Sequence, residues 1–375
     1  MSFVIAAGGT GGHITPALAV AAELQHLGKK VVFAGSLGGM EEHAVREAGL
    51  EYQGFAAKGF DRQKPWTLLS SSLLLARSTS KARKWLKEID AEAVAAFGGY
   101  VSVPVGRAAV REGVALLVHE QNSAMGWANK YLSRHAEVIA LTYAGAAEDL
   151  STKDRERVQI TGNPIRQEFA ALADDERALS LGHGFRDELG ISDAELLLLV
   201  FGGSQGARHI NQAVVSHARE LMERPDLTVV HVTGPKEFDS VERTLAEELN
   251  GCTERWHLLD YCNQMPAAFA AADIVVSRAG ASSLAELSMA AKPALLIPYP
   301  YATADHQRKN AESLVKAGAA TMVLDADLDS PHFLEALLSL IDNPELHQTM
   351  WEAARKLTKT NATARVAELL IGIAR

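Results

Sequence analysis

Two glycine-rich turns are the first features of the chain that suggest a chemical role. Residues 8–12 read GGTGG and residues 202–206 read GGSQG, and each turn follows an apolar run and precedes a helical pattern. Between a strand and a helix, such a turn lets backbone N–H groups and the positive end of the helix dipole approach a phosphate. Tight turns also need glycine for steric reasons. Two turns in register, with a third glycine pair before Tyr100, favour phosphate binding.

The turns lack the signatures of several other nucleotide-binding proteins. Neither contains the GxxxxGK[ST] pattern of P-loop NTPases, and the run 31–34 leads into Gly35 rather than into the acidic residue that binds a dinucleotide ribose. The second turn satisfies G-x-S-x-G, so a serine hydrolase with Ser204 as nucleophile is an alternative. Its later acid and base would be Asp305 and His306, which are adjacent and would normally point apart. In the phosphate interpretation, Ser204 donates a hydrogen bond to the phosphate.

Polar segments follow three other apolar runs. These are HEQN at 119–122, NPIR at 163–166 and RAGASSLAE at 278–286. Open α/β sheets bind ligands at the carboxyl ends of their strands, so we expect these segments to line a site. Glu286 falls about one helical turn after its loop, where a carboxylate can accept hydrogen bonds from a ribose diol. HEQN lacks the second histidine of HExxH, which excludes a zinc protease.

The alternation of apolar runs with helical patterns predicts an α/β protein with two doubly wound, Rossmann-like domains whose parallel sheets face each other across a cleft. The expected strands are 3–7, 31–34, 94–97, 115–118, 138–141 and 158–161, then 196–201, 227–232, 256–259, 274–277, 294–298 and 320–324. Residues 162–184 have no sustained apolar period, and we place the hinge there. The expected domains are 1–164 and 165–349.

Length and composition exclude several classes of protein. The chain has 375 residues, of which 47% are hydrophobic and 22% charged, and it contains two cysteines. These values argue against disorder and against a disulfide framework. A net charge of −9 disfavours a nucleic-acid partner. The D-x-D segment at Asp325 and Asp327 continues to Asp329 at the same spacing and is interpreted as an acidic loop, so neither a metal nor a cofactor is expected.

The segment from Lys58 to Lys87 departs from the acidic average. It carries eight lysines and arginines against Asp61, a net charge of +7, and it encloses an apolar stretch at 66–75. A basic flank beside apolar residues is typical of a segment that binds an anionic membrane surface. The alternative is a helix whose leucines belong to the core and whose cations are simply solvated.

Six segments together resemble one family. They are GGTGGHITPA at 8–17, FGGYVSVP at 97–104, HEQN at 119–122, GNPIR at 162–166, GGSQGA at 202–207 and RAGASSLAEL at 278–287. Their order is similar to that of the MurG family, within glycosyltransferase family 28. These bacterial enzymes transfer N-acetylglucosamine from UDP-N-acetylglucosamine to undecaprenyl-pyrophosphoryl-N-acetylmuramyl-pentapeptide (lipid I), giving lipid II. The match extends to about residue 311.

The resemblance implies a GT-B fold and inverting transfer without a metal. The second domain would bind the donor, the first would bind the acceptor, and a C-terminal helix at about 350–375 would pack back on the first. The anionic inner-membrane surface would be a partner through residues 58–87, with the protein peripheral on the cytoplasmic face of the cell membrane. The implied donor contacts are Thr10, Gly11, Gly12, Asn122, Arg166, Ser204, Cys262, Ala281, Ser282, Ser283, Leu284, Ala285, Glu286 and Gln307, and the implied acceptor-side residues are Gly98, Gly99 and Tyr100. Cys262 stands where the family usually has a branched aliphatic residue.

An inverting transfer needs a base for the attacking hydroxyl, and the sequence offers two candidates. His13, just after the first glycine turn, is the first, because an imidazole near neutral pKa accepts a proton reversibly. Glu120 is the second. Two rival functions stay open: a UDP-sugar epimerase, which can share this architecture, and a nucleotide-sugar-binding subunit without chemistry of its own.

Overall fold

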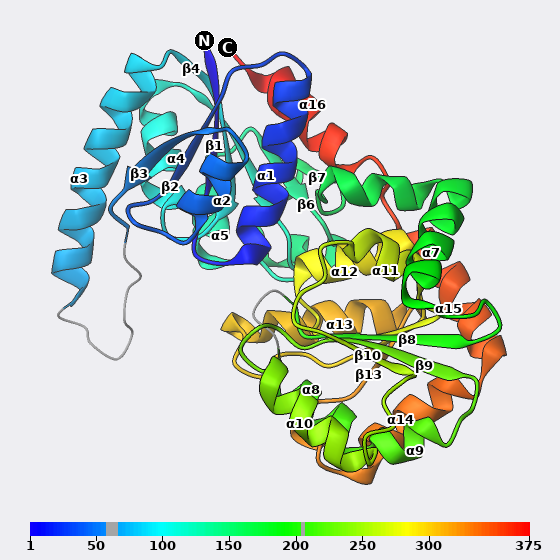
Figure 1. Cartoon of the computed structure of the whole chain (residues 1–375). Coiled ribbons are helices and arrows are strands. Elements are labelled where there is room, and N and C mark those ends of the chain that lie inside the picture. Colours follow the sequence, from blue (N-terminus) through cyan, green and yellow to red (C-terminus); the bar gives the residue numbers. More distant parts are fainter. Residues whose placement is uncertain (58–66, 204–206) are drawn as a thin grey trace. The chain divides into compact units, whose positions relative to one another are not determined.

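The chain folds into two compact α/β units. The computed structural model describes residues 1–57, 67–203 and 207–375, and the side chains of residues 67–71 lie outside this description. The first unit comprises Met1–Arg166 together with Asn361–Arg375, and the second comprises Gln167–Thr360 (Figure 1). The chain thus leaves the first unit two residues later than the sequence predicts. It returns at Asn361 rather than near residue 350.

A seven-stranded parallel sheet forms the centre of the first unit. Its order is β3-β2-β1-β4-β5-β6-β7. The strands are β1 (Ser2–Ala7), β2 (Val31–Ser36), β3 (Glu51–Phe55), β4 (Ala91–Gly98), β5 (Ala115–Glu120), β6 (Val138–Leu141) and β7 (Val158–Ile160). The strand order reverses between β1 and β4, and open α/β sheets bind ligands outside such a switch point. The turn 8–12 follows β1 and the glycine pair 98–99 closes β4, so both glycine segments lie there.

Helices cover both faces of this sheet because β1 alternates its side chains. Phe3 and Ile5 pack with α1 (Gly11–His26) and α16 (Ala362–Ile373), whereas Val4 and Ala6 pack with α3 (Thr67–Glu88) and α4 (Ser102–Glu112). The unit also contains α2 (Glu41–Glu47), α5 (Trp127–Ser133), η1 (Ala144–Asp149) and α6 (Thr152–Arg155). Figure 1 shows α16, in red, beside α1, in blue, and the two helices contact each other.

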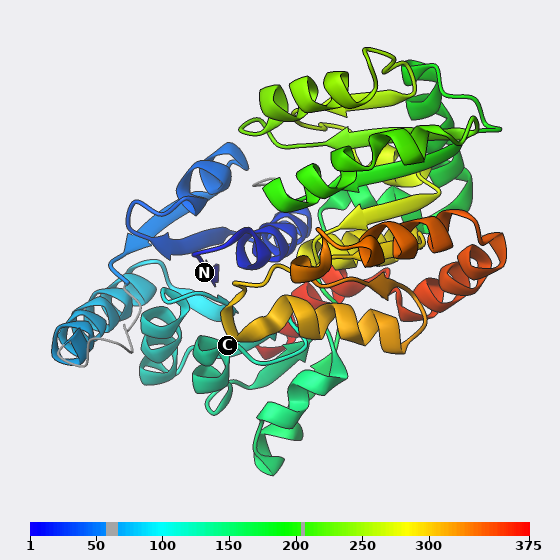
Figure 2. The ribbon, with the colours of Figure 1, turned by 90° about the horizontal axis from the view of Figure 1, so that it is seen from below.

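Both chain ends are attached to the same part of the first unit. The N and C ends lie close together (Figure 1 and Figure 2). The Met1 amino group lies 3.2 Å from the Asp90 carboxylate, and the backbone N–H of Arg375 donates to the Glu92 carbonyl over 3.4 Å. Asp90 directly precedes β4 and Glu92 lies within it. The C-terminal residues are therefore an integral part of the first unit.

A six-stranded parallel sheet, in the order β10-β9-β8-β11-β12-β13, forms the centre of the second unit. The strands are β8 (Leu196–Phe201), β9 (Leu227–Val232), β10 (Trp256–Leu259), β11 (Ile274–Ser277), β12 (Ala294–Leu296) and β13 (Thr321–Met322). Here the order reverses between β8 and β11. The turn 202–206 follows β8 and the segment 278–286 follows β11, so the second unit repeats the arrangement of the first.

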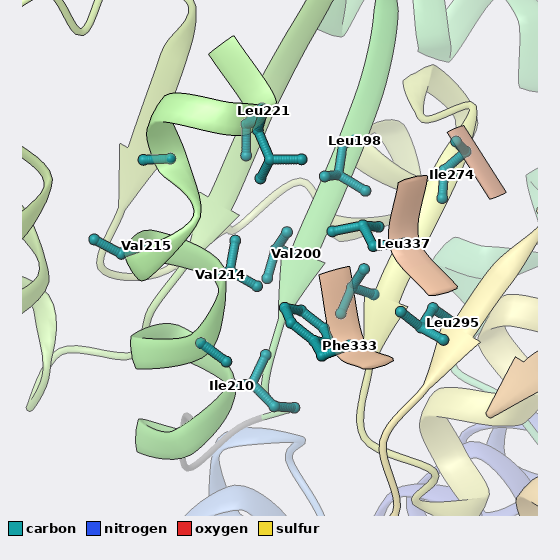
Figure 3. Close-up of a cluster of buried hydrophobic side chains, with 14 of the residues drawn as sticks. Leu198, Val200, Ile210, Val214, Val215, Leu221, Ile274, Leu295, Phe333 and Leu337 are labelled. Atoms are coloured by element: carbon teal, nitrogen blue, oxygen red, sulfur yellow. The ribbon is translucent and has the colours of Figure 1, made fainter. Parts of the chain in front are cut away.

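Apolar packing on one face of this sheet holds its helices in place. Val200 and Leu198 of β8 contact a cluster that includes Val214, Phe333 and Leu337 (Figure 3). The helices of the unit are η2 (Gln167–Ala173), α7 (Asp175–Leu189), α8 (Arg208–Ser216), α9 (Ala218–Met222), α10 (Phe238–Glu248), α11 (Met265–Ala271), α12 (Ala281–Ala290), η3 (Thr303–Asp305), α13 (His306–Lys316), η4 (Asp325–Asp327), α14 (Pro331–Ile341) and α15 (Pro344–Leu357).

Two features of the fold differ from the sequence expectation. The strand β3 was not predicted, because its only fully buried residues are Gly54 and Phe55 and its other positions are polar or half-buried. The expected hinge 162–184 contains η2 and most of α7. The sequence of α7 shows no helical apolar period, because Gly182 and Arg186 form part of its buried face. A Cβ at Gly182 would lie 3.0 Å from the backbone of Ala270.

Candidate functional site

The two glycine segments of the first unit pack against each other. Gly99 has φ +79°, and a Cβ at that position would lie 2.2 Å from the Gly8 carbonyl oxygen. Gly98 has φ +109°, and a Cβ there would lie 2.9 Å from the His13 ring. Only glycine tolerates this approach and this backbone conformation. At the switch point of the first sheet, the backbones of Gly8 and Gly99 are therefore in close contact, and the His13 imidazole lies beside Gly98.

The His13 ring is held by the glycine turn itself. Its Nδ1 lies 3.2 Å from the Gly8 carbonyl oxygen and 3.3 Å from Thr10 Oγ1. A carbonyl oxygen can only accept, so the contact with Gly8 requires the proton on Nδ1. In the neutral ring the lone pair is then on Nε2, which is the form that accepts a proton. Thr10 is the N-cap residue of α1, and Gly12 is the second residue of that helix.

His119, at the end of β5, is fully buried and connects that strand to the segment leading out of the unit. Its Nε2 lies 3.1 Å from the Gly162 carbonyl oxygen, and its Nδ1 accepts a hydrogen bond from Gln121 over 3.1 Å. Burial lowers the pKa of His119 to about 4, with the contact to Gly162 opposing the shift. The ring is therefore neutral at physiological pH and has a structural role.

Glu120 is 1% exposed and both of its carboxylate oxygens are occupied by donors. One oxygen accepts from the backbone N–H and the side-chain amide of Asn122, over 3.1 and 3.0 Å. The other accepts from the Gly126 N–H over 2.8 Å and from the Asn129 amide over 2.9 Å. This geometry fixes Asn122 and the start of α5. It is the geometry of an anchoring carboxylate, so we do not retain Glu120 as a candidate base.

We expect Glu120→Gln to destabilise the first unit. In this variant the four donors lose their ionised acceptor, and the new side-chain NH₂ group faces some of them. We expect the free energy of unfolding to fall by about 1.5–3 kcal/mol. Chemical denaturation measures the free energy of unfolding, and Glu148→Gln, at an exposed position, is the control. Equal stability of the two variants would contradict the anchoring role.

The other predicted residues of the first unit lie at or near the same sheet edge. Tyr100 is 55% exposed directly after β4, and Trp127, at the start of α5, is 60% exposed and stacks on Tyr131. Arg166 is the last residue of the unit before η2. Gly11 is exposed at the start of α1. The aromatic surface at Trp127 was not predicted, because nothing in the sequence pattern distinguishes it from a core position.

In the second unit, the turn after β8 is described only in part. Gly203 has φ +83°, which favours glycine. Residue Ser204, predicted to contact the donor, lies outside the described residues. The helix α8 starts directly afterwards at Arg208.

The start of α12 has no side-chain cap and carries a buried hydroxyl without a partner in the described part of the chain. Its N-cap residue is Gly280, which provides no side-chain cap for the backbone N–H groups of the first turn. The Ser282 hydroxyl is buried and has no hydrogen-bond partner among the described residues. A ten-residue helix presents a positive dipole end at such a terminus. This arrangement can bind a phosphate oxygen.

Side chains along α12 divide between the site and the core. Glu286 is 8% exposed and lies one turn after Ser282 and Ser283, on the same helix face. Leu284 is fully buried on the opposite side, so a ligand could contact only its backbone, and Ala281 is 4% exposed. Ala285 is half-buried and follows directly.

The Gln307 side chain joins two loops at the same sheet edge. Its Oε1 accepts from the Ala279 N–H over 3.2 Å and from the Tyr299 N–H over 3.0 Å. Its Nε2 faces Gly280, 4.0 Å from where a Cβ would stand. Only the amide nitrogen is therefore directed toward the start of α12.

Cys262 follows β10 and is 7% exposed. Burial raises the pKa of its thiol, so the group is protonated and unreactive at neutral pH. Within the described residues, no three His, Cys, Asp or Glu side chains are grouped so that they could bind a metal ion. The Asp325 carboxylate of the D-x-D segment instead contacts Arg278 and His209. His209 was not singled out from the sequence, because a histidine on an amphipathic helix has no pattern that marks it.

The described part of α3 is a basic surface with exposed apolar residues. Arg77, Lys81 and Lys84 are exposed, and so is Leu73, at 54%. Lys58 and the other cations before residue 67 lie outside the described residues. Of the helices in the ranges that the structure covers, none has the length and the apolar character needed to cross a membrane.

Two cations of the predicted basic segment form ion pairs with the same carboxylate of the unit. Arg83 and Lys87 both pair with Glu112 of α4, the latter over 2.8 Å. Trp85 and Leu86, in the last turns of the helix, are buried in the core. The sequence offered a membrane surface and a solvated core helix as alternatives. The C-terminal half of α3 has buried core residues, as the second alternative predicts, and exposed cations, which both alternatives predict.

Comparison with known proteins covers nearly the whole chain. Family models for the N-terminal and the C-terminal domain of glycosyltransferase family 28 match residues 3–141 and 197–369. A protein of Halothermothrix orenii is 36% identical over 372 residues, 99% of this chain and 98% of its own length. One of Leuconostoc mesenteroides is 36% identical over 373 residues, 99% of both. Both are named UDP-N-acetylglucosamine–N-acetylmuramyl-(pentapeptide) pyrophosphoryl-undecaprenol N-acetylglucosamine transferase.

Solved structures have the same fold. The crystal structure of MurG from Acinetobacter baumannii matches with a TM-score of 0.78 and 28% identity, covering 99% of both chains. A UDP-N-acetylglucosamine 2-epimerase of Neisseria meningitidis matches with a TM-score of 0.68 and 15% identity, covering 99% of this chain and 100% of its own. At that identity the second match shows the fold alone, so the architecture does not separate transferases from epimerases.

Proposed function

We infer the reaction from one premise: this chain belongs to glycosyltransferase family 28. We propose that it transfers N-acetylglucosamine from UDP-N-acetylglucosamine to the 4-hydroxyl of the muramyl sugar of undecaprenyl-pyrophosphoryl-N-acetylmuramyl-pentapeptide. The observation that carries this proposal is the full-length similarity to relatives named for that transfer, at 34–36% identity. The product of the reaction, lipid II, is a precursor of peptidoglycan.

The second unit would hold the donor. Its switch point combines the uncapped start of α12, the unpartnered Ser282 hydroxyl and the Glu286 carboxylate. The N–H groups and Ser282 match the oxygens of a diphosphate, and the carboxylate, on the same helix face, matches the two hydroxyls of a ribose. Ser204 and Arg166 would add donors to the diphosphate, the Gln307 amide would face the sugar, and Cys262 would contact the uracil through its backbone.

The first unit would bind the acceptor, with His13 as the base. In the neutral tautomer that the Gly8 carbonyl selects, Nε2 can take the proton from the attacking 4-hydroxyl. The oxygen then bonds to the anomeric carbon as the bond to the UDP oxygen breaks, with inversion. The electron pair leaves on UDP, whose charge the donors around α12 would stabilise, so we propose that no metal is required. Gly98, Gly99 and Tyr100 would lie along the acceptor.

An assay without acceptor separates the transferase from its rivals. Purified chain is incubated with UDP-N-acetylglucosamine alone, and with a soluble analogue of the lipid acceptor, each with and without chelator. We expect UDP release that depends on acceptor and is insensitive to chelator. Formation of UDP-N-acetylmannosamine without acceptor would support the epimerase instead. Donor binding without any turnover would support the binding subunit.

We also propose that the exposed side of α3 binds an anionic membrane surface on the cytoplasmic face, as a peripheral contact. Support comes from the exposed Arg77, Lys81 and Lys84 beside Leu73. Cations near such a surface each contribute about 1 kcal/mol. The lipid-anchored acceptor would then lie at the same surface as the unit that binds it.

The double variant Lys81→Glu, Lys84→Glu is expected to weaken binding to vesicles containing phosphatidylglycerol by roughly 30-fold or more, because two attractive charges become repulsive. Co-sedimentation measures the effect. Lys356→Glu, Lys359→Glu reverses two equally spaced exposed lysines of the second unit and is the control. Equal loss in both double variants would indicate a general charge effect and contradict the assignment to α3.

A further inference from the structure

The Asp325 carboxylate connects the helix α8 with the residue that follows β11. Asp325 lies at the start of η4, after β13, with a side chain that is 14% exposed. One of its oxygens accepts from the Arg278 guanidinium, and the other accepts from His209 Nδ1 over 2.8 Å. The structure thus gives the first residue of the D-x-D segment two side-chain partners from the same unit, an arginine and a histidine.

Arg278 connects the carboxyl ends of two neighbouring strands. It directly follows β11, and its Nη1 lies 3.3 Å from the Ile297 carbonyl oxygen and 3.4 Å from that of Pro298, after β12. Its guanidinium lies 5.5 Å from the centre of the Tyr299 ring. The Arg278 side chain is 10% exposed, so this cation acts within the protein. Arg278 therefore holds the loop that leads into α12 against residues 297–298. The next residue of that second segment is Tyr299, whose N–H donates to Gln307.

His209 links the same carboxylate to the other side of the switch point. It is the second residue of α8, three residues after the glycine turn 202–206. Its Nε2 also lies 3.2 Å from Asp329, whose side chain is 82% exposed. The Arg278, Asp325 and His209 side chains therefore hold the helix after the second glycine turn against the loop that leads into α12.

We propose that Asp325 and His209 are positioning residues for the UDP-sugar, which set the start of α8 and the start of α12 at the spacing that one diphosphate requires. This inference rests on the proposed function. Neither side chain is expected to touch the donor. Their effect passes through Arg278 and through the first turn of α8.

The network is expected to make donor binding depend on pH. Partial burial would lower the pKa of His209, but hydrogen bonds and charges from Asp325 and Asp329 raise it above the ordinary value. The charged groups that face the ring are these two carboxylates, with Arg278 behind Asp325. Because the pKa of the folded state is raised, the contribution of the pair is present at low pH. It is lost as the pH rises through that value.

The test is isothermal titration calorimetry of UDP with the full chain, from the pH at which an ordinary histidine titrates upward in steps through alkaline pH, because the pKa of His209 is raised. We expect Asp325→Asn to weaken UDP binding about tenfold at the lowest pH and His209→Gln about fivefold. The double variant should be weaker by less than the product of the two factors, because both act through one contact. Wild-type affinity should fall as the pH rises above the ordinary range of histidine, and the affinity of His209→Gln should not.

Asp327→Asn is the matched control, because its carboxylate is in the same loop and has no hydrogen bond or ion pair among the described residues. Steady-state kinetics adds a second readout: the donor KM should rise in Asp325→Asn with little change in kcat. Thermal unfolding verifies that each variant is folded. If Asp325→Asn does not fold, the pH profile of His209→Gln, whose side chain is 30% exposed, decides alone.

Wild-type affinity for UDP in Asp325→Asn and His209→Gln, or an unchanged pH profile in His209→Gln, would overturn the inference. The proposed function fails in a different way, with no UDP binding to the wild-type chain at any of these pH values. That outcome would remove the inference together with its premise.

Discussion

Replacing His13 with alanine is expected to lower the turnover of the transfer by about 10²- to 10⁴-fold, the usual contribution of general base catalysis. The affinity for UDP should hardly change, because His13 belongs to the first unit and the proposed donor residues belong mainly to the second. The Gly8 carbonyl holds the ring in the tautomer whose Nε2 accepts a proton. Steady-state kinetics at saturating substrate, together with calorimetry of UDP, measures both quantities.

The control for His13→Ala is His26→Ala, because His26 is an exposed histidine on the same helix. It should retain wild-type turnover. A further variant, His13→Gln, keeps a side chain that can donate to the Gly8 carbonyl but removes the basic nitrogen. If His13→Gln or His13→Ala turned over at the wild-type rate, His13 would not be the base.

Glu286→Ala is expected to weaken UDP binding by about 1.5–3 kcal/mol, roughly 10- to 150-fold, because the ribose hydroxyls lose a charged acceptor. The position supports this role, since the carboxylate lies one turn after the uncapped start of α12. Calorimetry with UDP measures the loss. Glu247→Ala, at an exposed position of α10, is the control and should bind normally.

A second ligand makes the test of Glu286 specific. The 2′-deoxy analogue of UDP lacks one of the two hydroxyls that the carboxylate would bind. We expect the wild-type chain to prefer UDP over this analogue and Glu286→Ala to bind the two nearly equally. A preference of wild-type size in the variant would show that another group recognises the ribose.

Most of the fold follows from the sequence, because buried parallel strands are continuous apolar runs. The runs at 196–201 and 227–232 coincide with β8 and β9 in full. The strand β3 is missed because an edge strand needs few apolar residues, and only Gly54 and Phe55 are buried in it. The helix α7 is missed because Gly182 and Arg186 provide part of its packing face, so no apolar period marks it.

The locations of the candidate site segments follow from the sequence, but the functions of their side chains do not. Motif and strand end together place His13, Glu120 and Glu286 at the carboxyl edges of the two sheets. Glu120 is assigned an anchoring role rather than that of a base because Asn122, Gly126 and Asn129 donate hydrogen bonds to its carboxylate. Such contacts depend on the conformation of a loop, and no residue spacing reveals them.

The role of Asp325 could not be predicted for a related reason. Its partners Arg278 and His209 precede it by 47 and 116 residues in the chain. The three residues meet because β8, β11 and β13 end at one edge of the same sheet. The sequence alone shows only three aspartates at regular spacing, which we interpret as an acidic loop.

Mass spectrometry of the acceptor is the most direct test of the proposed transfer. The purified chain is mixed with UDP-N-acetylglucosamine and a lipid I analogue, and the acceptor is analysed before and after the reaction. We predict that the acceptor gains one N-acetylhexosamine, that one UDP is released for each transfer, and that chelator has no effect. An acceptor of unchanged mass in the presence of folded, UDP-binding protein would contradict the account.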